Sequence, residues 1–99
     1  MRQIGTAPTI HAVTTEAYTG AVGSIIDLEV TDNVAVKSVE VSFTTANGDL
    51  PEEGNAVQDA NSPKWSYTAT VLNNQLGGTN ILVKAKDHAG NETVFEKAL

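Results

Sequence analysis

Four stretches of the chain alternate apolar and polar residues with a period of two, the pattern of a β-strand with one buried face. In one of them Ile26, Leu28 and Val30 share a face, while acidic and hydroxyl residues occupy the other. No segment shows a sustained period of 3.6 residues, so the sequence predicts an all-β fold. The four stretches are Ser24–Thr31, Val36–Phe43, Lys64–Leu72 and Asn80–Lys86.

Shorter strands complete the predicted set. Thr9–Thr14 is expected to place Ile10 and Ala12 on one face, with His11 and Val13 on the other.

A short strand is predicted at Asn55–Gln58, between two clusters of turn residues. The tight polar loop Asp87–Asn91 separates the strand before it from a last strand that contains Val94 and Phe95. Polar turns therefore divide the chain into about seven strands at spacings of roughly 8–12 residues, which favours an antiparallel β-sandwich.

Trp65 and Tyr67 alternate on one face of the Lys64–Leu72 strand. An exposed pair would be a platform on which a sugar ring stacks, whereas a buried pair would supply much of the core of a small sandwich. The chain holds only five aromatic residues, so we expect Trp65 in the core. Tyr18, in a turn region, is the better candidate for an exposed ring.

Composition limits the classes of partner. With 99 residues the chain is expected to form a single domain, residues 1–99, in which 1–8 resembles a linker. The net charge of −6 disfavours nucleic acid, because a phosphate backbone would be repelled. The chain has no cysteine, which excludes disulfides and thiolate metal sites, and no apolar run long enough to insert into a membrane.

Residues suited to catalysis are few. His11 lies among apolar residues and His88 lies in a polar loop beside Asp87. The nucleophile motif G-x-S-x-G is absent from the sequence. We therefore expect a protein that is not an enzyme. An enzyme would need a pocket that holds one of these histidines with a partner.

Three motifs, in this order and spacing, resemble those of bacterial immunoglobulin-like domains. They are Thr6–Ile10 (TAPTI), Val30–Val41 (VTDNVAVKSVEV) and Val83–Thr93 (VKAKDHAGNET). The resemblance spans nearly the whole chain, and residues 44–63 lie outside it.

The resemblance implies an immunoglobulin-like sandwich of about seven strands, often repeated in tandem in bacterial cell-surface or secreted proteins. The expected function is a non-catalytic structural or adhesive module, with neighbouring domains of the same polypeptide as partners. The alternative is a carbohydrate-binding accessory module of a secreted glycan-active enzyme. Either role implies an extracellular or cell-surface location, and a host protein or a carbohydrate is a candidate ligand.

The most notable polar set is Asp32, Asn33, Asp87 and Asn91. In an immunoglobulin-like sandwich the two loops that carry them lie at the same pole, which is also where the chain begins its first strand. Two carboxylates and two amides offer the hard oxygen ligands that calcium prefers, so the set is a candidate calcium site. The alternative is that each side chain closes its own loop as an Asx-turn.

The loop that contains Asp59 and Asn61 would join this pole if the short strand before it is placed correctly. Strands that alternate in direction further predict that the chain starts at this pole and ends, after Lys97, at the opposite one.

Overall fold

The computed structural model describes residues 7–32, 36–49, 52–60, 62–74 and 76–99. This part of the chain forms strands and no helix, as the sequence predicted, and so contains no helix that could span a membrane. The strands are β1 (Thr9–Thr14), β2 (Ile25–Thr31), β3 (Val36–Thr44), β4 (Glu52–Asn55), β5 (Val57–Gln58), β6 (Lys64–Thr68), β7 (Asn80–Asp87) and β8 (Glu92–Ala98).

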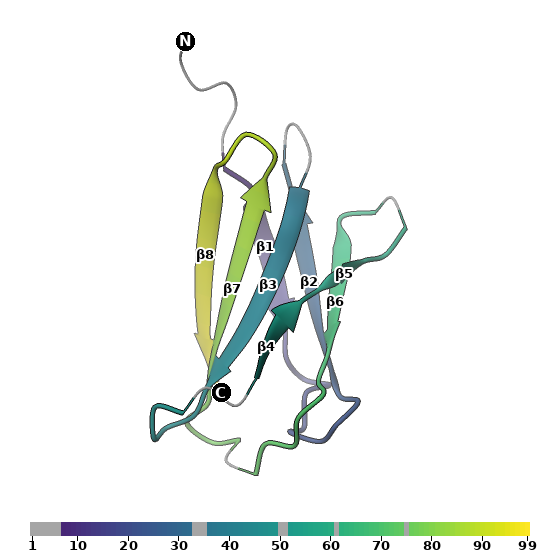
Figure 1. Cartoon of the computed structure of the whole chain (residues 1–99). Coiled ribbons are helices and arrows are strands. Elements are labelled where there is room, and N and C mark those ends of the chain that lie inside the picture. The colour runs from purple at the N-terminus through teal and green to yellow at the C-terminus, as the bar shows by residue number, and fades with distance from the viewer. Residues whose placement is uncertain (1–6, 33–35, 50–51, 61, 75) are drawn as a thin grey trace.

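The strands form two antiparallel sheets that pack face to face (Figure 1). One sheet has the order β1-β2-β6-β5 and the other has the order β4-β3-β7-β8. With β1, β2, β5 and β6 as strands A, B, D and E, and β3, β7 and β8 as C, F and G, this is the immunoglobulin arrangement. The strand β4 is additional, and it lies at the edge of the second sheet.

The core lies between the sheets, and its main residues were predicted from the alternating pattern. The inward side chains of β2, β3 and β7 are almost completely buried, because each stands on the face that meets the opposite sheet. These residues are Ile26, Leu28, Val30, Val39, Val41, Phe43, Ile81, Val83 and Ala85. Trp65 and Tyr67 join them from β6.

The predicted faces of the first strand were partly wrong. The pairing of β1 with β2 shifts between Ile10 and Ala12, so His11 is an extra residue in a β-bulge. Beyond the bulge the alternation is reversed. Val13 is therefore buried and Ala12 is exposed, and Val13 shares the core side with Ile10.

The predicted strand Asn55–Gln58 is two strands. β4 pairs with β3 in one sheet, and β5 pairs with β6 in the other, so the chain crosses between the sheets at Ala56. The Ala56 side chain is buried, and its N–H donates to the Val39 carbonyl oxygen at 2.7 Å. The sequence Glu-Glu-Gly-Asn in β4 has the composition of a turn, which is why the pattern did not reveal a strand.

Glu52 points inward from β4, although it is a charged residue. It pairs with the buried Phe43, and its carboxylate accepts hydrogen bonds from four donors on and after β6. The Tyr67 hydroxyl (2.5 Å), the Thr70 N–H (2.6 Å) and the Thr70 hydroxyl (3.0 Å) donate to Oε2, and the Val71 N–H donates to Oε1 at 3.3 Å. The carboxylate thus connects the two sheets.

This contact explains why the predicted strand Lys64–Leu72 ends at Thr68. The N–H groups of Thr70 and Val71 donate to Glu52 and not to a neighbouring strand. Gly54 leaves room for the Tyr67 ring, since a Cβ at this position would lie 3.0 Å from it. Burial, together with the hydrogen bond to Glu52 and its charge, raises the pKa of the Tyr67 phenol, which therefore stays protonated and remains a donor.

The two poles of the sandwich hold the two ends of the described chain. We call the end with the β7–β8 turn the upper pole and the end with the β6–β7 loop the lower pole (Figure 1). At the upper pole the Thr93 hydroxyl donates to the Pro8 carbonyl oxygen, just before β1. At the lower pole the Leu99 N–H donates to the Thr79 carbonyl oxygen at 2.8 Å. The predicted separation of start and end is confirmed.

We predict that Tyr67→Phe lowers the free energy of unfolding by about 1.5–3 kcal/mol, because it removes a buried donor to a carboxylate and leaves the ring in place. Tyr18→Phe is the matched control. Its buried hydroxyl accepts a hydrogen bond from a neutral donor, Asn73 Nδ2, at the longer distance of 3.3 Å, so the expected loss is about 0.5–1.5 kcal/mol. Urea unfolding measures both values. An equal loss in the two variants would contradict the proposed importance of Glu52.

Candidate functional site

The upper pole brings together three of the four side chains of the predicted calcium set. Asp32 follows β2, Asp87 ends β7, and Asn91 stands immediately before β8. The side chain of Asp32 is near enough to influence the pKa of the Asp87 carboxyl. Asn33 lies outside the described residues, as does Asn61 of the β5–β6 loop.

Asp87 is only 3% exposed and acts as the centre of the β7–β8 turn. Its Oδ1 accepts hydrogen bonds from the backbone N–H groups of Ala89 (2.9 Å) and Asn91 (2.8 Å). Its Oδ2 accepts one from Asn91 Nδ2 at 2.9 Å. Gly90 completes the turn with a φ of 95°, a conformation that glycine adopts without steric cost. The side chain therefore closes its own loop, as the Asx-turn interpretation predicts.

These hydrogen bonds determine the charge of Asp87. Burial alone raises the pKa of its carboxyl. The hydrogen bonds that the side chain and backbone of Asn91 and the backbone of Ala89 donate stabilise the charged form and lower the pKa below its ordinary value. At neutral pH Asp87 is thus an anion, and the N–H groups of the turn that donate to it stabilise its negative charge.

For a metal ion, this arrangement offers few open ligands. Among the residues that the structure describes, no group of three or more His, Cys, Asp or Glu side chains could hold a metal ion. Both Oδ1 lone pairs and one Oδ2 lone pair of Asp87 already accept donors. A calcium ion would have to use the remaining oxygen positions of Asp87, Asp32 and the backbone, or displace Asn91 Nδ2.

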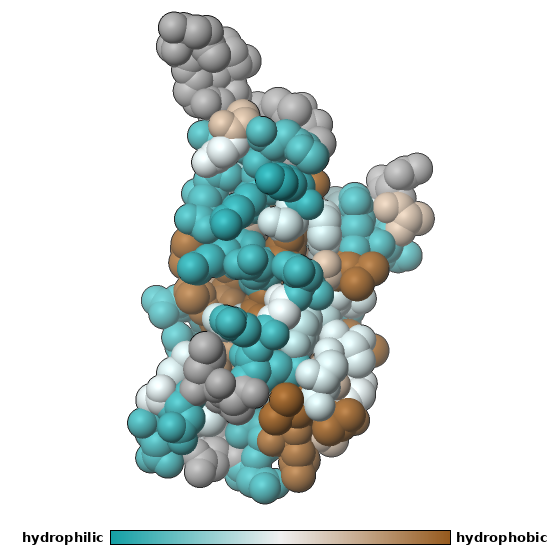
Figure 2. All heavy atoms as spheres, viewed as in Figure 1, coloured by the Kyte–Doolittle hydropathy of each residue, from teal (hydrophilic) through white to brown (hydrophobic). Residues whose placement is uncertain are grey.

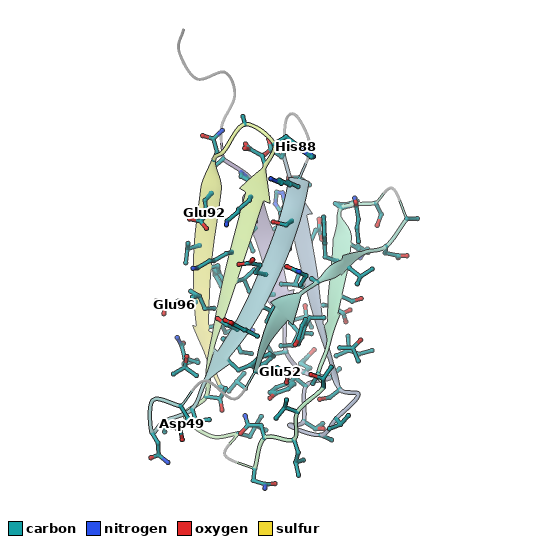
Figure 3. All side chains as sticks on the ribbon, in the orientation of Figure 1. Asp49, Glu52, His88, Glu92 and Glu96 are labelled. Atoms are coloured by element: carbon teal, nitrogen blue, oxygen red, sulfur yellow. The ribbon has the colours of Figure 1, made fainter. Side chains whose placement is uncertain are left out.

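Both histidines are exposed. His11 Nε2 is 2.6 Å from the Thr31 hydroxyl at an exposed position of β1, and His88 is exposed at the upper pole (Figure 3). A shallow hollow of about 300 Å³ lies on the outer face of the β4-β3-β7-β8 sheet. It is lined by polar side chains around Leu82, including Glu40, Glu53 and Lys84. The lining side chains offer charge and hydrogen bonds, and neither histidine is among them.

The aromatic residues are mainly core residues. Trp65 is 7% exposed and Tyr67 is also buried, as expected for the core alternative. The prediction of an exposed Tyr18 was wrong. Its ring packs against Phe43 at a centroid distance of 5.0 Å, which the turn composition around it did not reveal. Phe95 is the one aromatic residue with substantial exposure, 39%.

Sequence reasoning also missed two exposed apolar regions. Val22, Val71 and Leu72 are exposed on neighbouring loops at the lower pole, where Figure 2 shows a hydrophobic area. These loops are joined by the hydrogen bond from the Asn73 N–H to the Gly20 carbonyl oxygen, at 2.7 Å. The second region is on β8. A loop assignment predicts exposure but does not indicate which loops lie side by side.

Comparison with known proteins gave no further identification. No protein-family model matches the sequence, and neither a curated protein nor a solved structure matches the chain. The resemblance to bacterial immunoglobulin-like domains therefore rests on the three sequence motifs, while the sandwich itself is observed.

The lowered pKa of Asp87 predicts a stability that depends on pH. Because its folded-state pKa lies below the ordinary value of 3.8, the stabilisation is present above that pH and is lost as the pH falls through the folded-state pKa. Asp87→Asn should lower the melting temperature at pH 7, and the difference from the native chain should shrink below about pH 4. Thermal melts from pH 2 to pH 7 measure this. A difference that stays constant over this range would contradict the role of the charge.

Calcium binding at the upper pole stays a prediction, and an amide titration tests it. A bound ion should shift the amide signals of Asp32, Ala89 and Asn91 at millimolar calcium and raise the melting temperature. Asp87→Asn should abolish both effects, since it removes a carboxylate ligand. If these amides do not move, the domain has no autonomous calcium site and the upper-pole carboxylates close the turn only.

Proposed function

We propose that this domain is a non-catalytic structural module of a bacterial cell-surface or secreted multidomain protein, and that it holds neighbouring domains apart. The observation that carries the proposal is the position of the chain ends. The chain starts β1 at the upper pole, near Thr93, and reaches Leu99 at the lower pole (Figure 1). Domains joined through such ends are arranged in a row.

The strand lengths support this geometry. β3 has nine residues, and at about 3.3 Å per residue it spans roughly 30 Å between the poles. Each module would therefore add at least this length to a row, and the antiparallel pairing of β3 with β7 along it resists shortening.

The hydrogen-bonded poles also suit a spacer. Asp87 orders the turn beside the start of the chain, and at the lower pole the buried Asn73 side chain donates to the hydroxyls of Tyr18 (3.3 Å) and Thr79 (3.0 Å). Thr79 is the residue whose carbonyl oxygen holds Leu99. The chain is thus attached to an ordered part of the sandwich just before β1 and just after β8, which favours transmission of orientation from one domain to the next.

The surface gives less support to the carbohydrate-binding alternative. Figure 2 shows mainly hydrophilic residues over the outer face of the β4-β3-β7-β8 sheet. Sugar-binding platforms use exposed aromatic rings, and four of the five aromatic residues are buried. Phe95 alone would have to serve. An adhesive role remains part of the proposal, because recognition of a protein does not need aromatic stacking.

A fusion of two copies, with Leu99 of the first joined to Met1 of the second, tests the spacer function. We expect small-angle scattering to give a maximum dimension close to twice that of one copy. A compact particle, in which the copies lie side by side, would contradict the proposal. A fusion with a flexible ten-residue glycine-serine linker is the control for loosely connected domains, and it should show a broader distribution of distances.

The alternative function has its own test. If the domain binds polysaccharides, its migration in native gels that contain soluble glucans, xylans or mannans should be retarded, and Phe95→Ala should restore free migration. We expect no retardation of either protein. Retardation that Phe95→Ala removes would favour the carbohydrate-binding module over the spacer.

A further inference from the structure

Four strands form the edges of the two sheets, and three of them are poor templates for pairing with another chain. β5 has two residues and β4 has four, so both edges are short. β1 is interrupted by the bulge at His11. Short strands and bulges are the usual ways in which proteins protect a sheet edge.

The fourth edge, β8, is regular. Its seven residues pair with β7 from Asn80–Ala98 to Lys86–Glu92 without a shift in register, and it contains no proline. Its two central side chains are exposed, Val94 at 52% and Phe95 at 39%. They lie on opposite faces of the sheet, so apolar surface is available on both sides of this edge.

The charges of β8 are distributed unequally between its two faces. Glu92 and Glu96 share the outer face with Val94, because they stand opposite the outward residues of β7 (Figure 3). The inner face carries Thr93, Phe95 and Lys97. Lys97 is held at the open side of the sandwich, where its ammonium group donates to the Val13 carbonyl oxygen at 3.1 Å. On its outer face β8 itself therefore carries two carboxylates and no basic side chain, while Lys84 and Lys86 stand on the same face of the neighbouring β7.

This charge pattern disfavours a second copy of the chain as the occupant of the edge. If two β8 strands paired antiparallel with Val94 of one opposite Val94 of the other, Glu92 of each copy would stand opposite Glu96 of the other. If the two Glu96 residues were the central pair, these two carboxylates would stand opposite each other. Pairing around Phe95 would leave Glu96 diagonal to Glu92 and Glu96 of the other copy. Each copy also carries a net charge of −6, so the overall fields repel.

We propose that β8 is a docking edge for an extended, basic segment of another protein, which adds as an antiparallel strand beside it. Backbone hydrogen bonds would provide the pairing, and the side chains of the segment would be selected by the residues opposite them. The proposal is independent of the spacer role, since it concerns the side of the sandwich and not its poles.

The register of β8 specifies the chemistry of the segment. Basic residues should lie opposite Glu96 and Glu92, four positions apart, with apolar residues opposite Phe95 and Val94 and a hydroxyl residue opposite Thr93. Read along the segment, the order is basic, apolar, apolar, hydroxyl, basic. A basic residue opposite Lys97 would be repelled, so the pattern also limits how far the positive charge extends.

The test is an amide titration of the native domain with a blocked peptide of sequence GKFVTKG. We expect saturable shifts in residues of β8, with smaller shifts in β7 and at Val13. A peptide with glutamate in place of both lysines, GEFVTEG, is the matched control, and it should cause no saturable shift. Raising the ionic strength should weaken binding of the basic peptide, because the charges are exposed.

The double variant Glu92→Lys/Glu96→Lys reverses the preference. Both positions are exposed, so the variant is expected to keep the amide spectrum of the native fold outside β8 and its neighbours. It should bind GKFVTKG roughly tenfold more weakly or worse and should bind GEFVTEG instead. A scrambled peptide of the same composition, GFKKVTG, should bind the native domain more weakly than GKFVTKG.

Three results would overturn the proposal. The first is a titration in which the shifts map to β1, β4 or β5 and not to β8. The second is equal binding of the basic and acidic peptides. The third is a set of β8 shifts that depend on protein concentration without peptide, because these would identify a second copy as the occupant.

Discussion

The carboxylate of Glu52 is the contact on which the arrangement of the two sheets depends. The carboxylate belongs to a residue of β4, in one sheet. It accepts hydrogen bonds from β6, in the other sheet, and from the segment that follows β6. An anion that is 6% exposed would be strongly unfavourable without compensation, and four donors provide it. This compensation defines three features at once: β4 faces inward at Glu52, β6 ends at Thr68, and the Tyr67 ring is placed against Phe43, with 5.7 Å between the ring centroids.

Polar contacts of this kind suit a chain of this size. A domain of about one hundred residues buries roughly two thirds of its unfolded surface, and this chain has no cysteine with which to add a covalent constraint. The apolar core holds the middle of the sandwich, while the loops at both poles need other contacts. Asp87 supplies them at the upper pole, and Glu52 and Asn73 supply them at the lower pole. These contacts hold the chain where β1 begins and where β8 ends.

Much of the fold could be predicted from the sequence, and the failures have physical causes. Period-two alternation located the inward faces of β2, β3 and β7, because burial of one face is what produces that pattern. The pattern failed at His11, because a bulge there reverses the alternation. It also failed at Glu52, because a glutamate in a polar stretch of sequence is typical of a turn, whereas this one is buried. The motifs placed Asp32 and Asp87 at one pole. Which donors each carboxylate accepts depends on loop geometry that no spacing encodes.

The carboxylates of this protein act in different ways according to the donors that surround them. Asp87 and Glu52 are enclosed by N–H and O–H groups of the chain itself, so their negative charge contributes to structure and is little available to a ligand. Glu92 and Glu96 are exposed on β8, and Glu96 accepts an exposed hydrogen bond from Asn80 Nδ2, at 3.0 Å. Their charge protects the edge against pairing between copies. The same charge is a selective attraction for a basic strand, so protection and recognition are two consequences of one pattern.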